Sequence, residues 1–199
     1  MASKTVTVQD KHKEKTTIRK AEPRDAHAIK GLAESLRLKT DEKRQNGFLV
    51  YILDEAEYGN RAKIAGYFYL AAKGKELTGF LMCYSDAELA KIAEAGKLDR
   101  EDCIVSYVKR QSTPYIFGDQ IGVAEPCMRN GTGKSLMQKL FANAAKNTTR
   151  EMYVAILHRP IRNTASINFC SSLGFKQISE VTNKDGYVWG IYHTNIPVT

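Results

Sequence analysis

A glycine-rich turn carries the clearest chemical signal in the sequence. Gly131-Thr132-Gly133-Lys134-Ser135 follows a strand-like stretch at 115–123 and precedes an amphipathic stretch at 134–146. Two glycines let the backbone approach a ligand closely, and the free N–H groups of a first helical turn favour an anion. Arg129 and Lys134 add positive charge on both sides. The turn therefore predicts a pyrophosphate site, with a plain connecting turn as the alternative.

Two familiar phosphate-binding motifs do not fit this turn. A nucleotide P-loop needs a glycine five positions before Gly133, where the chain has Met128. A dinucleotide-binding G-x-G-x-x-G needs a glycine at the position of Leu136. Neither a nucleotide-hydrolysing nor a dinucleotide-binding protein is indicated.

Asp119 is the carboxylate best suited to proton transfer. In a regular strand over 115–123 it would share one face with Tyr115, Phe117, Ile121 and Val123. On such an apolar face it would be partly desolvated, and its pKa should rise toward a useful range. The alternative is a structural carboxylate paired with an Arg or Lys. Glu125, near the end of the strand, is the second candidate.

The cysteines and histidines do not form a metal or disulfide pattern. The chain has no C-x-x-C, and the residues concerned are scattered: Cys83, Cys103, Cys127, Cys170, His12, His27, His158 and His193. We therefore expect no metal site, and we expect the cysteine thiols to be buried and inert.

Length and composition indicate one ordinary globular domain. The chain has 199 residues, of which 43% are hydrophobic and 26% charged. The longest apolar runs, such as 48–53 and 152–157, are six residues long, so no membrane-spanning segment is expected. Residues 1–20 are polar and do not resemble a secretory leader, which makes the cytoplasm the expected compartment.

Positive charge is concentrated at the start of the chain. The net charge is +8, and residues 1–20 contribute +4 of it, from six Lys or Arg against Asp10 and Glu14. Residues 1–15 are expected to be a basic, flexible tail. A basic arm can reach a nucleic-acid backbone, but no aromatic residue is interleaved here for base stacking. A solvated tail is the favoured interpretation.

Hydrophobic periodicity predicts alternating strands and helices. Strands are expected at 16–22, 67–72, 77–84, 115–123, 152–157, 175–181 and 187–193. Helices are expected within 21–39, around 54–62, and at 87–96, 134–146 and 163–173, with some helical character in 98–111. This order predicts a mixed α/β sheet with helices on both faces.

Two motifs on these elements resemble the GNAT superfamily of N-acetyltransferases. The first runs from Val123 through Gly131-x-Gly133-x-x-Leu136 and is similar to the family's coenzyme-A-binding motif. The second begins at Asn163, continues through Ser166 and Phe169-Cys170, and ends at Gly174-Phe175. The resemblance covers about 16–193. It implies an α/β fold with a mixed, mostly antiparallel central sheet of six to seven strands, in a single domain at 16–199.

The resemblance also implies a co-substrate and the residues that hold it. Acetyl-CoA would place its pyrophosphate over the turn and its pantetheine arm along the strand, where the Val123 amide would stabilise the oxyanion. Asn163 would contact the pantetheine arm, cap a helix, or do both. The implied cofactor-binding residues are Ile121, Val123, Arg129, Asn130, Gly131, Thr132, Gly133, Lys134, Asn163 and Phe169.

The sequence departs from the family at two places that concern catalysis. Met128 stands where the family usually has Gln or Arg. Cys170 stands where a tyrosine often protonates the departing thiolate, and we expect it to be a packing residue. Tyr115, Tyr187 or Tyr192 could then supply a hydroxyl. The candidate catalytic residues are Asp119, Tyr187 and Glu125.

The predicted function is acetyl transfer from acetyl-CoA to a primary amine of unidentified nature. The alternatives are an acyl-CoA-binding module with weak or no catalysis, and a nucleic-acid-associated protein that uses the basic tail. The expected partners are acetyl-CoA and the amine, without membrane or nucleic acid; a homodimer is allowed. Acceptor-site residues should come from 38–63 and 86–111.

Overall fold

The structure is a computed structural model of the chain. It describes residues 16–39, 46–95, 103–111, 114–147 and 149–197. The predicted basic tail at 1–15 lies outside the described residues.

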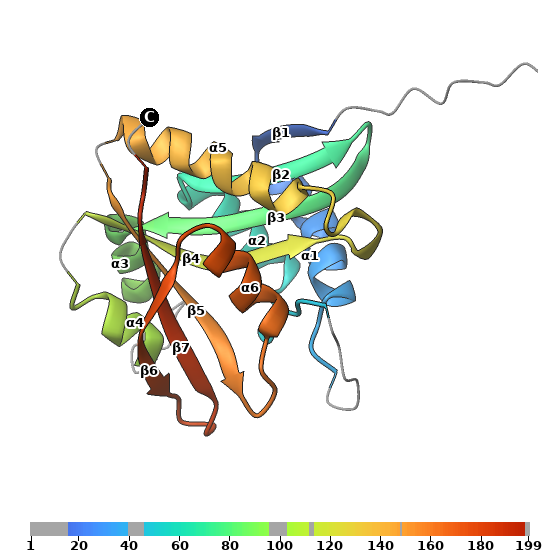
Figure 1. Cartoon of the computed structure of the whole chain (residues 1–199). Coiled ribbons are helices and arrows are strands. Elements are labelled where there is room, and N and C mark those ends of the chain that lie inside the picture. The colour runs from blue at the N-terminus through green and yellow to red at the C-terminus, as the bar shows by residue number, and fades with distance from the viewer. Residues whose placement is uncertain (1–15, 40–45, 96–102, 112–113, 148, 198–199) are drawn as a thin grey trace, which may run out of the picture.

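One mixed sheet organises the described residues (Figure 1). Its strands are β1 (Thr17–Lys20), β2 (Tyr67–Lys73), β3 (Glu76–Ser85), β4 (Tyr115–Val123), β5 (Glu151–Arg159), β6 (Lys176–Thr182) and β7 (Val188–Asn195). Their spatial order is β1-β2-β3-β4-β5-β7-β6. Neighbours run antiparallel except β4 and β5, which are parallel. The predicted mostly antiparallel sheet is confirmed.

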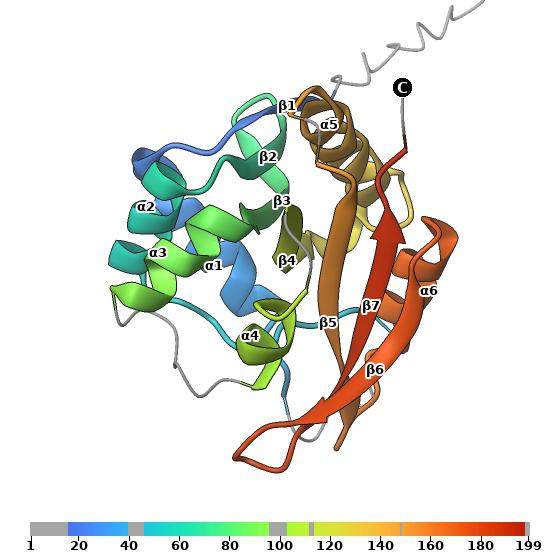
Figure 2. The same cartoon turned by 90° about the vertical axis from the view of Figure 1, so that its left-hand side faces the viewer.

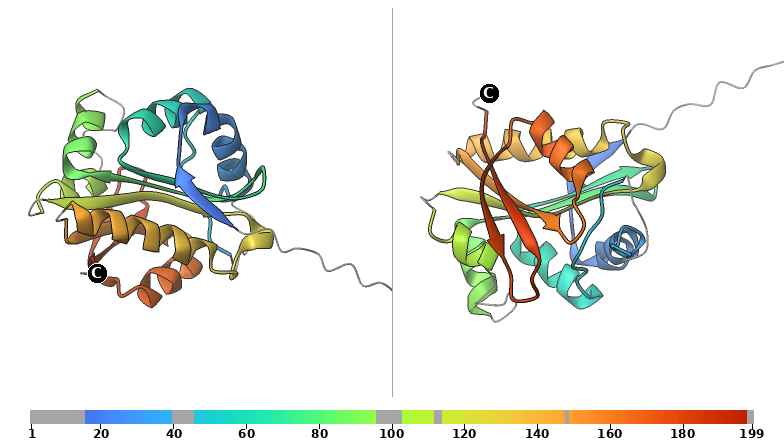
Figure 3. Two further views of the ribbon diagram at one scale, coloured as in Figure 1. Left: turned by 90° about the horizontal axis from the view of Figure 1, so that it is seen from above. Right: turned by 60° about the horizontal axis from the view of Figure 1, so that its bottom comes forward.

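Helices cover both faces of this sheet, as Figures 2 and 3 show. One face carries α1 (Ala26–Ser35), α2 (Glu55–Ile64), α3 (Asp86–Glu94) and α4 (Cys103–Val108). The other carries α5 (Thr132–Lys146) and α6 (Thr164–Ser172). Two 3-10 turns, η1 (Pro23–Asp25) and η2 (Glu125–Cys127), precede α1 and α5. No helix in the described ranges is both long enough and apolar enough to cross a bilayer.

Local capping explains where several helices begin. The Asp54 carboxylate accepts a hydrogen bond from the Glu57 amide and caps α2. Ser85 and Glu88 form a reciprocal capping box at the start of α3. These caps set the helix starts within a few residues of the positions that the sequence predicts.

A bulge interrupts β4 at the carboxylate of interest. In the pairing with β3, Met82 lies opposite Gln120 and Cys83 lies opposite Gly118, so Asp119 is the extra residue on the β4 side. The regular alternation predicted for 115–123 is therefore wrong beyond Gly118. A bulge shifts the following side chains by one position. Phe117 and Gln120 face the α1–α4 side, whereas Ile121 packs with the α5–α6 side.

The parallel pairing of β4 with β5 ends just before the bulge. It runs from Tyr115 opposite Glu151 to Gly118 opposite Val154. Both strands continue, β4 to Val123 and β5 to Arg159, but they diverge (Figure 1). Beyond Gly118 the β5-facing backbone edge of β4 is therefore not used by the sheet.

A buried hydrogen-bond chain fixes the strand just after the bulge. The Tyr58 hydroxyl donates to Gln120 Oε1 at 2.8 Å, and Gln120 Nε2 donates to the Tyr51 carbonyl at 2.9 Å. Tyr58 is 0% exposed and Gln120 7%. These bonds attach β4 to α2 and to the segment before it, so they hold the neighbouring Asp119 in place.

Tyr58→Phe should lower the free energy of unfolding by about 1–2 kcal/mol, because it leaves the buried Gln120 Oε1 without its donor. Denaturant titration would measure the change. Tyr107→Phe is the matched control, since the Tyr107 hydroxyl has no hydrogen-bond partner among the described residues. Equal stability of the two variants would show that the Tyr58–Gln120 bond contributes nothing.

Candidate active site

A cavity of about 410 Å³ lies where β4 and β5 diverge. Both strands line it, together with Met137 of α5, Phe169 and Cys170 of α6, Arg61 of α2 and Trp189 of β7. The segment at 48–53 adds several side chains to the wall. Because its lining comes from both helical layers, the cavity connects the two faces of the sheet.

The glycine turn precedes α5 at the end of β4. Gly131 is the N-cap of α5 with φ of +83°, and Arg129 also has a positive φ, of 60°. The first amide to bond within the helix is that of Ser135, which donates to the Gly131 carbonyl at 2.9 Å. No side chain caps the helix. The first-turn amides are therefore available to an anion, as at other helix N-termini.

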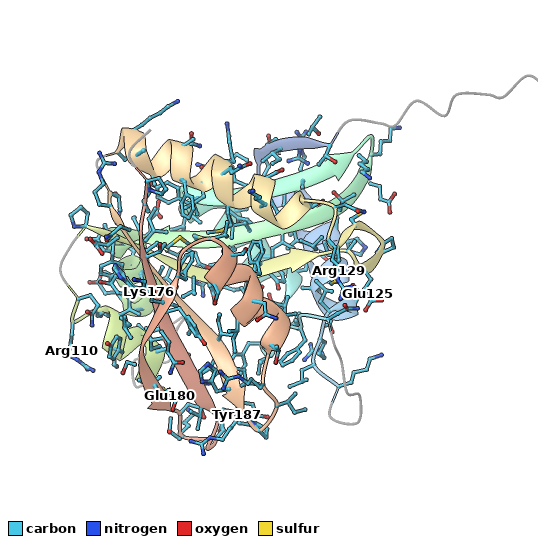
Figure 4. The ribbon with its side chains drawn as sticks, in the orientation of Figure 1. Arg110, Glu125, Arg129, Lys176, Glu180 and Tyr187 are labelled. Carbon is cyan, nitrogen blue, oxygen red and sulfur yellow. The ribbon has the colours of Figure 1, made fainter. Side chains whose placement is uncertain are left out.

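The turn offers polar and positive groups around these amides. Arg129, Asn130 and Lys134 are exposed, whereas Thr132 is buried and its hydroxyl faces the Cys127 carbonyl at 3.5 Å. Figure 4 shows Arg129 beside Glu125 on the outside of the turn. The geometry suits a phosphate group, and four of the predicted residues lie together here.

The start of α5 packs closely against α6. A Cβ added at Gly133 would lie 3.3 Å from the Phe169 ring and 3.7 Å from Ile121 Cδ1. The structure thus brings together three predicted cofactor residues from β4, α5 and α6. Ile121 and Phe169 line the cavity; Val123 lies between the cavity and the turn, opposite Gly79 of β3.

The Asn163 side chain makes two hydrogen bonds, one that caps α6 and one that holds a distant segment of the chain. Its Oδ1 accepts from the Ser166 amide at 3.2 Å, so it caps α6 as one of the sequence interpretations expected. Its Nδ2 donates to the Phe48 carbonyl at 3.0 Å. This second bond, between residues 115 positions apart, has no signal in the sequence. Asn163 is 6% exposed and lines the cavity.

Asp119 lines the cavity on the α1–α4 side of the sheet. Its Oδ2 accepts a hydrogen bond from the Tyr84 hydroxyl at 3.0 Å. Burial, reinforced by the Asp119 charge, raises the pKa of Tyr84 well above its ordinary value. Tyr84 therefore remains a protonated donor that orients the carboxylate.

A buried arginine lies near this pair. Arg61 is 1% exposed, its Nε donates to Glu57 Oε1 at 2.7 Å, and its Cζ lies 5.4 Å from the Tyr84 ring centre. Tyr84 and Arg61 are not among the residues predicted from the sequence. Glu57 and Arg61 are four residues apart, and such a pair in a helix normally indicates a solvent-exposed ion pair. The sequence therefore does not indicate that Arg61 is buried next to Tyr84.

Two candidate catalytic residues, Glu125 and Tyr187, lie away from this cavity. Figure 4 shows Glu125 on the outer turn after β4 and Tyr187 near the β6–β7 turn. Glu125 is exposed. Tyr187 packs against the core of the α1–α4 face and lines a separate hollow with Asp185 and Gly186. Neither lines the cavity between β4 and β5.

The other two candidate tyrosines, Tyr115 and Tyr192, also lie outside the cavity and contact other side chains. Tyr115 packs edge-on against Tyr153, and it is 2% exposed. The Tyr192 hydroxyl pairs with His158 Nε2 at 3.0 Å, and His158 Nδ1 pairs with Glu180 at 2.6 Å. Strand register, which the sequence does not reveal, decides these placements.

Cys170 lines the cavity but is 7% exposed. Burial raises the pKa of Cys170 to about 12. Its thiol is therefore protonated and slow to react, which agrees with the packing role expected for it. All four cysteines are free thiols, and the described residues contain no group of three or more His, Cys, Asp or Glu that could hold a metal ion.

Solved structures show the same fold at low identity. Ard1 from Thermoplasma volcanium superposes with a TM-score of 0.65 at 14% identity, covering 92% of this chain and 98% of that one. NAA60 from Arabidopsis thaliana, in complex with acetyl-CoA, gives 0.63 at 12% identity and covers 92% and 100%. The ribosomal-protein-S18-alanine N-acetyltransferase from Escherichia coli gives 0.59 at 14% identity and covers 93% and 96%.

Sequence comparison identifies the family. No curated protein matches the chain significantly. The profile of the acetyltransferase (GNAT) family matches residues 33–175. This match spans well over half of the chain and contains the bulged strand, the glycine turn and most of the cavity wall. The protein therefore belongs to the GNAT family of acetyltransferases.

Proposed function

We propose that the protein transfers an acetyl group from acetyl-CoA to a primary amine. The observation that carries the proposal is the cavity between β4 and β5, which has Asp119 in its wall and whose lining residues Ile121 and Phe169 lie next to the uncapped start of α5. Such a cavity can admit an acyl thioester from one end and an amine from the other, so that their reacting atoms meet inside it, which is what direct transfer requires.

Three features support a site for acetyl-CoA. The first-turn amides of α5, with Arg129 and Lys134 nearby, suit the pyrophosphate. The edge of β4 beyond Gly118, where its pairing with β5 has ended, suits the amide groups of the pantetheine arm, which would add to the sheet like a short strand. The backbone amide of Val123 is our candidate donor to the carbonyl oxygen of the acetyl group.

Asp119 is our candidate for the proton acceptor. An amine is protonated at neutral pH and must lose a proton before it attacks a carbonyl. The Asp119 carboxylate reaches the cavity and is oriented by the Tyr84 hydroxyl. It could accept the proton directly or through a water molecule.

Cys170 supports the alternative of an acyl-CoA-binding protein with weak catalysis. A buried thiol with a pKa of about 12 is a poor proton donor to a departing thiolate. Acetyl-CoA binding without thiol release, over a broad panel of amines, would favour this alternative over acetyl transfer.

Gly131→Asp should weaken acetyl-CoA binding at least tenfold, or by about 1.4 kcal/mol, through charge repulsion of the pyrophosphate. Gly131→Asn is the matched control, because both side chains tolerate a positive φ and nothing lies within 4 Å of the added Cβ. Calorimetric titration should show the difference shrinking at high salt. Equal affinities of the two variants would contradict the anion site.

Asp119→Asn should lower kcat by roughly 10²–10⁴-fold, the usual contribution of a general base, and leave acetyl-CoA affinity nearly unchanged. Thiol release measures the first quantity and calorimetry the second. Glu125→Gln, the other candidate base, should behave like the wild type because Glu125 is exposed outside the cavity. Near-normal turnover of Asp119→Asn would make Asp119 a structural carboxylate.

Cys170→Ala should keep kcat within a few-fold and lower stability by about 1 kcal/mol, because it leaves a small void. Cys170→Tyr should destabilise by roughly 1–3 kcal/mol through overpacking of a position that is 7% exposed. Thermal unfolding and thiol release test both variants. A hundredfold loss of kcat in Cys170→Ala, with acetyl-CoA affinity intact, would instead identify Cys170 as the catalytic acid.

A further inference from the structure

Trp189 presents a buried donor that the protein itself does not satisfy. The side chain lies on β7, lines the cavity and is 7% exposed. Its Nε1 has no hydrogen-bond partner among the described residues. More than nine in ten buried polar groups in proteins are paired, because an unpaired one costs free energy. This N–H therefore points to an acceptor atom that enters the cavity.

The segment at 46–53 holds the indole in place. Tyr51 stacks on Trp189 with ring centres 5.9 Å apart and planes inclined by 20°. The Tyr51 carbonyl accepts from Gln120 Nε2 at 2.9 Å, and its hydroxyl accepts from Asn183 Nδ2 at 3.0 Å. The Phe48 carbonyl is held by Asn163 at 3.0 Å. Bonds to β4, α6 and the β6–β7 turn thus fix the aromatic pair before any ligand binds.

The charges of the cavity suit a single ammonium group. Asp119 is the one carboxylate among the described lining residues, and Arg61 is the one cation. The wall on this side is otherwise largely apolar, with Leu53, Ile104, Val105, Phe117 and Leu157. A second ammonium group would meet apolar surface or the Arg61 charge, which is costly without a partner. Polyamines are therefore poor candidates for the acceptor.

We propose that the acceptor is a primary amine with an apolar body and one uncharged oxygen that accepts a hydrogen bond from Trp189 Nε1. The ammonium group would face Asp119, and the apolar body would pack on the wall beside the Tyr51–Trp189 pair. The assignment of this ligand as an acetyl acceptor rests on the proposed acetyl transfer, whereas its binding can be measured without it.

Trp189 is the only tryptophan in the chain, so its fluorescence reports directly on this site. The full-length protein saturated with CoA, which cannot donate an acetyl group, would be titrated with three probes. Phenylalaninamide has the amine, the apolar body and the oxygen; 2-phenylethylamine lacks the oxygen; spermidine has several charges and no apolar body. Phenylalaninamide should shift the emission and bind roughly 3–10-fold more tightly than 2-phenylethylamine, as expected for one hydrogen bond. Spermidine should bind most weakly.

Trp189→Phe keeps an aromatic ring beside Tyr51 and removes the N–H donor together with part of the indole ring system. By calorimetry, this variant should lose the preference for phenylalaninamide over 2-phenylethylamine and retain its affinity for the latter. Equal affinities of the two probes for the native protein would overturn the proposal without any variant. A preference that survives in Trp189→Phe, or no binding of any amine, would overturn it as well.

Thiol release from acetyl-CoA separates this proposal from the proposed function. Phenylalaninamide binding with the expected Trp189 dependence, but without thiol release, would contradict acetyl transfer and leave the ligand site standing. Turnover of amines without dependence on Trp189 would contradict the ligand site and leave acetyl transfer standing.

Discussion

The extra residue in β4 determines most of what this site can do. The bulge at Asp119 directly follows the last β4–β5 pair, Gly118 opposite Val154. Bulges bend a strand and increase its twist, and β4 and β5 diverge from this point. The divergence opens the cavity and leaves one backbone edge of β4 unused. A regular strand would have continued the parallel pairing and closed the space in which two substrates could meet.

The bulge also separates the chemistry of the two faces. Asp119 and Gln120 follow each other in the chain, yet both turn toward the α1–α4 side, where Tyr84 and Tyr58 hold them. Ile121 turns to the α5–α6 side and contacts the glycine turn region. In the proposed reaction, the amine and the carboxylate therefore occupy one layer while the phosphate groups occupy the other, so each site is built from different elements.

Local sequence patterns predicted the helices and strands, whereas contacts between residues far apart in the sequence determine the shape of the candidate active site. The strand at 115–123 has the predicted bounds, and α5 begins two residues before the predicted 134. Alternation and capping are encoded in neighbouring residues, so they can be read directly. A bulge has no comparable signature, and the predicted alternation failed after it, where Gln120 and Ile121 face the opposite sides from those expected. Glu125 was chosen because it lies near the end of the strand, and Tyr187 was one of three tyrosines that could supply a hydroxyl. The bonds that shape the cavity, by contrast, join residues as distant as Phe48 and Asn163.

The cysteine at position 170 limits how the departing sulfur can be protonated in the proposed reaction. Its pKa of about 12 makes the thiol a weak acid, and Tyr115, Tyr187 and Tyr192 lie outside the cavity. The reaction balances without a dedicated acid, because a neutral amine brings its own proton. When the nitrogen forms the amide bond it must lose that proton, and the sulfur that leaves the same carbon carries the matching negative charge. Direct transfer between these two atoms needs only that the cavity keep them close, so the absence of a tyrosine at position 170 is compatible with turnover.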